Sequence, residues 1–184
     1  MSKTIENPEE LLILISKILD ELNIDFYVSG GFAVSVWGRP RFTADIDLII
    51  NLEEKNIDQL AKKLKEELPE AYIDKLQMEK ALANLGEFNV IEPSIGMKID
   101  FWVLKNDEYG KLSLRRSVKQ DIGRKVRFVS PEDLVISKLI WYKKDSSSRH
   151  LEDIRSVLDI STVDRKYVKE WVKKFNLEKG YKEI

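Results

Sequence analysis

The sequence contains no cysteine and only one histidine, His150, among its 184 residues. The absence of cysteine excludes disulfides, thiolate metal sites and cysteine nucleophiles. A single histidine excludes a zinc site built from several histidines. Carboxylates would therefore have to hold any metal ion, and oxygen ligands favour magnesium, manganese or calcium.

Long apolar runs and an excess of one charge are also missing. No apolar run approaches the roughly 20 residues that a membrane span needs, and the N-terminus lacks the pattern of a secretory signal. We therefore expect a cytoplasmic protein without a membrane partner. The 31 Lys and Arg nearly balance the 32 Asp and Glu, so any attraction to nucleic acid must come from a local patch.

The sequence does contain a clear succession of helix and strand signals. Apolar spacing predicts helices near 8–22, 32–37, 57–68 and 73–85, and β-rich runs predict strands at 25–29, 45–50, 88–91 and 97–104. Helices near 134–143, 151–158 and 167–175 follow a helix start at Ser130 and Pro131. This order predicts an α+β fold, with residues 1–129 as an α/β core and residues 130–184 as a helical region packed on it in one compact domain.

A glycine pair ends the first predicted strand. Gly30 and Gly31 follow Ser29 directly and lead into a predicted helix. Without a Cβ, glycine lets a phosphate group approach the backbone N–H groups at a helix start. Taken alone, a glycine pair at a strand end is more often a plain turn than a phosphate site.

Two acids share the next predicted strand. Asp45 and Asp47 stand two residues apart, so their carboxylates point to the same face and repel each other unless a cation lies between them. Ile46 and Leu48 on the other face are expected in the core. The alternative is an edge strand with a solvated acidic face.

A third acid, Asp100, interrupts a strand that is otherwise fit for burial. An unpaired carboxylate there would cost several kcal/mol, so it needs a cation or a hydrogen-bonding partner. The alternative to a metal is a salt bridge with Lys98 on the same face. If the strand lies beside that of Asp45 and Asp47, the three acids could hold two magnesium ions about 3.5–4 Å apart.

This combination resembles the signature of the DNA polymerase β-like nucleotidyltransferase superfamily. The matching pieces are the glycine pair, Asp45-Ile46-Asp47-Leu48, and Asp100. The segments 41–47, 130–138 and 149–154 further resemble the small abortive-infection-toxin-like (AbiEii-type) and minimal nucleotidyltransferases. The resemblance covers most of residues 25–158 and implies a small mixed sheet flanked by helices.

The resemblance also implies roles for individual residues. It implies transfer of a nucleoside monophosphate from a triphosphate such as ATP, with Mg²⁺ (two ions) or Mn²⁺ as cofactor. Asp45 and Asp47 would hold both ions, and Asp100 would complete the catalytic one and help to activate the acceptor hydroxyl. The nucleotide-binding candidates are Ser29, Gly30, Gly31, Arg41, Thr43 and Lys138.

Several basic residues have plainer alternatives. Arg39 and Arg41 could bind phosphates or simply pair with surface acids, and Lys138 could reach the triphosphate or snorkel to solvent. The basic stretch 111–127, with a turn expected at Gly123, could contact RNA or be a solvated face. No role follows for His150, which we expect to be exposed, and the four scattered tryptophans predict no stacking platform.

The acceptor stays open at the level of sequence. Phe32-Ala33-Val34 after the glycines departs from the residues found there in CCA-adding enzymes and in minimal nucleotidyltransferases. Transfer RNA, a protein side chain and a small molecule are all candidate acceptors, and a toxin–antitoxin role with a protein partner follows from likeness alone. The alternative function is an inactive nucleotide- or partner-binding module on the same fold.

Overall fold

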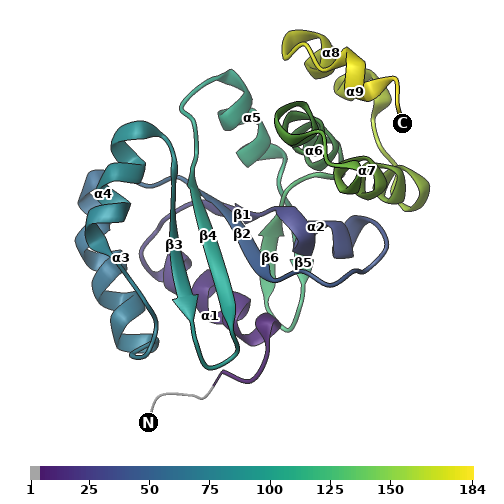
Figure 1. Cartoon of the computed structure of the whole chain (residues 1–184). Coiled ribbons are helices and arrows are strands. Elements are labelled where there is room, and N and C mark those ends of the chain that lie inside the picture. Colours follow the sequence, from purple (N-terminus) through teal and green to yellow (C-terminus); the bar gives the residue numbers. More distant parts are fainter. Residues whose placement is uncertain (1–4) are drawn as a thin grey trace.

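The computed structural model describes residues 5–184 and contains a six-stranded mixed sheet (Figure 1). The strand order is β3-β4-β2-β1-β6-β5, where β2 pairs in parallel with β4 and β1 with β6, and the other neighbours are antiparallel. The strands are β1 (Phe26–Val28), β2 (Asp45–Ile50), β3 (Glu87–Glu92), β4 (Met97–Val103), β5 (Val118–Asp121) and β6 (Lys125–Phe128). The predicted α+β class and mixed sheet are confirmed.

Three helices of the first half build the main hydrophobic core with the sheet. They are α1 (Pro8–Glu21), α3 (Glu54–Glu67) and α4 (Lys75–Asn84), and α3 packs against both of the others. Figure 1 shows α3 and α4 beside β3. The alternating pattern of β2 buries Ile46, Leu48 and Ile50 completely in this core, as its sequence predicts.

The remaining helices gather around the other parts of the sheet. They are α2 (Gly30–Trp37), α5 (Glu108–Arg116), α6 (Pro131–Asp145), α7 (Ser148–Ile160), α8 (Arg165–Lys174) and α9 (Glu178–Tyr181). Helix α6 contacts α2, α7, α8 and α9, which makes it the centre of the C-terminal group (Figure 1). Within residues 5–184, no helix combines the length and the apolar character that crossing a membrane requires.

The basic stretch 111–127 differs from its prediction. Gly123 does form the expected turn, with φ +87°, between β5 and β6. Residues 111–116 of the stretch belong to helix α5, which begins at Glu108. This helix was not predicted from the sequence. Asp107 caps this helix by accepting a hydrogen bond from the Gly110 amide at 2.7 Å.

Candidate active site

The acids of β2 and β4 lie side by side on one face of the sheet. Asp47 and Asp100 are direct partners in the parallel pairing of these strands, and Asp45 lies opposite Lys98. Because residues two apart share a face, Asp45, Asp47 and Asp100 form a single group, called the acid face below. The expected pairing of the two strands is confirmed, and the edge-strand alternative is wrong, because β2 is an interior strand.

Asp47 carries the electrostatic strain of this group. Burial, together with the neighbouring charges of Asp45 and Asp100, raises the pKa of Asp47 to about 6. Lys138 and a hydrogen bond from Trp102 oppose this rise only in part. A cation placed at the acid face would offset the repulsion that adds to the effect of burial on this pKa.

The other two acids each have a partner within the protein. Thr43 Oγ1 donates to Asp45 Oδ1 at 2.7 Å, and Lys98 Nζ lies 2.7 Å from Asp100 Oδ2. The salt bridge considered as the alternative for Asp100 is therefore present. Among residues 5–184, no three acids or histidines stand arranged as a metal-binding group.

The donor set of the acid face nevertheless fits a divalent cation. Three carboxylates share one face, two of them as direct cross-strand partners, and hard cations prefer carboxylate oxygens. The Lys98 side chain is 45% exposed, so it can swing into water and leave Asp100 free. Asp45, Asp47 and Asp100 are the residues that would hold the ion.

The glycine pair packs directly against the acid face. Gly30 has φ +59°, and a Cβ at this position would stand 1.7 Å from Asp47 Oδ2. A Cβ on Gly31 would stand 2.5 Å from Thr43 Oγ1. The start of α2, with its free backbone N–H groups, therefore lies beside the acids only because both residues are glycine. Ser29 precedes them and donates its amide to the Asp47 carbonyl at 2.8 Å.

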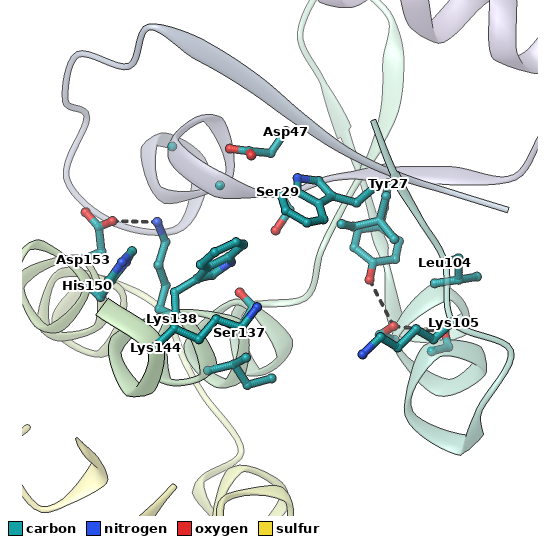
Figure 2. A pocket seen from close by; sticks show the side chains of 18 of the residues that line it. Tyr27, Ser29, Asp47, Leu104, Lys105, Ser137, Lys138, Lys144, His150 and Asp153 are labelled. Carbon is teal, nitrogen blue, oxygen red and sulfur yellow. Dashed lines mark hydrogen bonds and ion pairs between the residues drawn. The ribbon is translucent and has the colours of Figure 1, made fainter. Parts of the chain in front are cut away.

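A buried ion cluster flanks the acids on the side of α6 and α7. Asp153 accepts two bonds from Arg41, at 2.7 and 2.9 Å, and lies 2.8 Å from Lys138 Nζ (Figure 2). Burial would raise the pKa of Asp153, but Arg41 and Lys138 together lower it. The Lys138 side chain is only 8% exposed, so the snorkelling alternative is wrong. Arg39, in contrast, pairs with exposed Asp159.

Sequence reasoning assigned no role to Asp153. Its signal was an acid among the apolar residues Leu151 and Ile154 of a predicted helix, which is a pattern that demands a buried partner. Arg41 lies 112 residues away along the chain, so the spacing could not reveal the partner.

A cavity of about 980 Å³ opens from the acids between the sheet and α6. Its walls include all nucleotide-binding candidates, Asp45 and Asp47, whereas Asp100 lies outside the lining beside Lys98. Figure 2 shows Asp47 and Ser29 on one side and Lys138 on the other. The cavity continues toward α5 and the chain after α8, where Tyr109 and Leu177 line it.

The structure brings two tryptophans together at the cavity wall, and the expectation that His150 is exposed is wrong. Trp102 of β4 and Trp141 of α6 meet edge to face at the cavity wall, with ring centroids 5.4 Å apart. His150 also lines the cavity, with only 17% of its side chain exposed, because Asp145 binds its Nε2 at 3.0 Å. Both arrangements join residues from different elements, which local patterns do not reveal.

The fold is shared with nucleotidyltransferases of the polymerase β-like class. The antibiotic-resistance factor ANT(2'')-Ia superposes with a TM-score of 0.61 at 16% identity, over 95% of this chain and 94% of that one. The lincosamide antibiotic adenylyltransferase LnuA superposes with a TM-score of 0.56 at 13% identity, over 86% of this chain and 100% of that one. A nucleotidyltransferase-like protein from Paracoccidioides brasiliensis gives 0.56 at 19%, over 91% and 86%. No curated protein sequence matched the chain.

The family model described as nucleotidyl transferase AbiEii toxin, type IV toxin–antitoxin system, matches residues 13–180. The chain belongs to this family and is a nucleotidyltransferase. The sequence resemblance to AbiEii-type enzymes is thereby confirmed.

Proposed function

We propose that this nucleotidyltransferase transfers a nucleoside monophosphate from a triphosphate to an acceptor hydroxyl with the help of two magnesium ions at the acid face. The observation that carries the proposal is the direct pairing of Asp47 with Asp100, with Asp45 on the same face. Manganese, with similar oxygen ligands, would substitute. Bound there, the ions would stabilise the charge on the attacking oxygen and on the departing pyrophosphate.

The protein's own residues bind and orient the nucleotide. The amides of Gly30 and Gly31 at the start of α2 face the triphosphate, and Ser29 and Thr43 offer hydroxyls beside them. Lys138 and Arg41 supply positive charge from the cavity wall. Asp153 forms ion pairs with the side chains of Lys138 and Arg41, so both side chains are oriented before the nucleotide arrives.

Asp100 acts on the acceptor. The acceptor oxygen forms a bond to the α-phosphorus while the bond from that phosphorus to pyrophosphate breaks, and Asp100 takes the acceptor proton. Asp100 lies outside the cavity that the nucleotide-binding candidates line. This position supports a role toward the acceptor, because the acceptor must approach from the side opposite the leaving group. Lys98 leaves Asp100 when the site is loaded.

RNA is the acceptor class that a surface feature of the protein favours. Lys119 and Arg127 are direct cross-strand partners on β5 and β6, and both are exposed. Like charges placed opposite each other disfavour the hairpin unless an anion lies near, and a phosphate backbone is such an anion. A toxin role, with a protein antitoxin as partner, follows from the family description.

The test is incubation of the protein with each α-labelled nucleoside triphosphate, magnesium and either cellular RNA or protein extract. We expect label on RNA, and none with Asp45→Asn, which retains the fold but loses a ligand. Label on protein would keep the transferase and replace the acceptor. Magnesium-dependent nucleotide binding without transfer to either extract would point to a small-molecule acceptor, and absence of nucleotide binding would overturn the proposal.

A further inference from the structure

The inner part of the cavity contains a buried hydroxyl pair that the proposed reaction does not use. Tyr27 OH and Ser113 Oγ lie 3.1 Å apart, and both residues line the cavity (Figure 2). Tyr27 is 6% exposed and Ser113 is 1% exposed. Buried hydroxyls facing an open cavity have a defined set of free hydrogen-bonding positions, which can be counted.

The proton count leaves Tyr27 as an acceptor toward the cavity. Ser113 Oγ donates its only proton to the Gly110 carbonyl at 3.0 Å. The proton between the two hydroxyls must then come from Tyr27, which donates to Ser113 Oγ. Burial raises the pKa of Tyr27 to about 12, so the phenol keeps this proton at neutral pH. The Tyr27 oxygen therefore offers lone pairs and no proton to a ligand.

A second hydroxyl of the cavity has the same polarity. Ser137 Oγ donates to the Leu134 carbonyl at 2.9 Å, so it also presents only lone pairs to the cavity. Three lysines of the lining, Lys105, Lys143 and Lys144, are exposed, whereas Lys138 is buried in its ion pair with Asp153. The buried hydroxyls of Tyr27 and Ser137 thus accept hydrogen bonds from the cavity, whereas the three exposed lysines lie where water competes for them.

The position of Tyr27 fits the base of a nucleotide bound at the acid face. Tyr27 is the cross-strand partner of Ile49, two residues or about 7 Å along β2 from Asp47 and on the same sheet face. Tyr27 also stands three residues before Gly30, so β1 places both the phosphate end and this hydroxyl. The Trp102–Trp141 pair supplies apolar wall between them, on which a flat ring can stack.

We propose that Tyr27 selects triphosphates whose base carries an exocyclic amino group, by accepting a hydrogen bond from it. This inference rests on the proposed function, because it assumes that the nucleotide phosphates lie at the glycine pair. Adenine and cytosine present such an amino group, whereas uracil and hypoxanthine present a carbonyl oxygen at the same place. A carbonyl facing the Tyr27 oxygen would leave two acceptors without a proton between them.

The experiment compares nucleotides that differ only in this group. Dissociation constants are measured by calorimetry with magnesium and no acceptor, for CTP against UTP and for ATP against ITP. For the unmodified protein we expect CTP and ATP to bind about tenfold more tightly than their partners, the size of one buried hydrogen bond. Tyr27→Phe should bring both ratios close to one by weakening CTP and ATP alone.

Two further variants complete the test. Ser113→Ala frees the Tyr27 proton for the ligand, so UTP and ITP should gain affinity. Tyr142→Phe makes the same substitution on α6 outside the cavity, where the hydroxyl binds Glu183, and should change neither ratio. Equal binding of both nucleotides of a pair, or ratios that survive Tyr27→Phe, would overturn this inference alone. Failure of every nucleotide to bind would overturn the proposed function with it.

Discussion

Two buried carboxylates of this protein have the same burial problem and opposite surroundings. Asp47 lies on the acid face, and Asp133 lies at the start of α6, where it is 1% exposed. Burial raises the pKa of both groups. The neighbours of Asp133 then lower its pKa, whereas two of the neighbours of Asp47 are acids that raise it further.

The surroundings of Asp133 are complete within the protein. Ser130 Oγ donates to it at 2.7 Å, Tyr167 OH donates at 2.8 Å, and Arg116 lies 3.5 Å away. Arg116 also covers the Tyr167 ring at 4.0 Å. These residues, called the α6 network, join α5, α6 and α8. The comparison teaches that the protein stabilises Asp133 with its own residues, whereas under the proposed function a bound cation would stabilise Asp47.

The largest expected effect is on activity at the acid face. Asp47→Asn should lower the transfer rate at least about 100-fold, because it removes a ligand that stabilises charge in the transition state. Stability to urea should not fall, because a like charge disappears. Asp58→Asn, at an exposed acid paired with Lys75, is the control and should alter neither quantity. A loss of folding that matches the loss of activity would erase the contrast with Asp133.

The next largest effect is on stability at the α6 network. Asp133→Ala should lower the free energy of unfolding by about 2–4 kcal/mol, because it removes the acceptor of the Ser130 and Tyr167 hydroxyls. Arg116 keeps its ion pair with Glu132 at 2.9 Å. Urea unfolding measures this loss. Asp159→Ala, which breaks an exposed pair with Arg39, should cost less than about 1 kcal/mol. Equal losses for the two variants would mean that the network does not stabilise the junction of α5, α6 and α8.

Local patterns predicted the fold where one element carries its own signal. The alternation of residues 45–50 predicted the bounds and both faces of β2. The start of α1 lies at the predicted residue 8, where Asn7 caps the helix by accepting from the Glu10 amide at 2.9 Å. Helix α5 was missed because Gly110 argues against a helix interior. Glycine is needed there because a Cβ would stand 2.0 Å from the Lys105 carbonyl, a contact that no local pattern contains.

In the candidate site, too, local patterns predicted single residues but not the contacts between distant segments. Period-two spacing placed Asp45 and Asp47 on one face, and a polar residue in an apolar strand marked Asp100. The Arg41–Asp153 pair and the Trp102–Trp141 contact join distant segments, so only the tertiary structure reveals them. The sequence therefore predicts the candidate acids and the candidate cations Arg41 and Lys138, but neither the acid that holds those cations nor the aromatic contact at the cavity wall.

Alanine variants of Gly30 and Gly96 distinguish the cost of backbone strain from damage to the acid face. Gly30 and Gly96 have φ +59° and +61°, and a Cβ on Gly96 would meet nothing within 4 Å. Gly96→Ala should cost only the left-handed backbone penalty, about 1–2 kcal/mol. Gly30→Ala should cost more, because its Cβ displaces Asp47, and it should also abolish manganese binding. Equal unfolding free energies for the two variants would show that Asp47 is not held against Gly30.

The smallest expected effect concerns Lys98, whose side chain forms an ion pair with Asp100 at the acid face. Lys98 occupies Asp100 in place of a metal, so removing its charge by Lys98→Met should tighten Mn²⁺ binding. The gain should be about two- to fivefold, because a partly exposed ion pair contributes only about 0.2–1 kcal/mol. Electron paramagnetic resonance of free Mn²⁺ gives the dissociation constant. Lys62→Met removes the same charge at a 77% exposed side chain and corrects for the change in net charge. If Lys98→Met instead weakens Mn²⁺ binding relative to Lys62→Met, Lys98 supports the loaded site, and the acid face, like the α6 network, is stabilised by a cation of the protein.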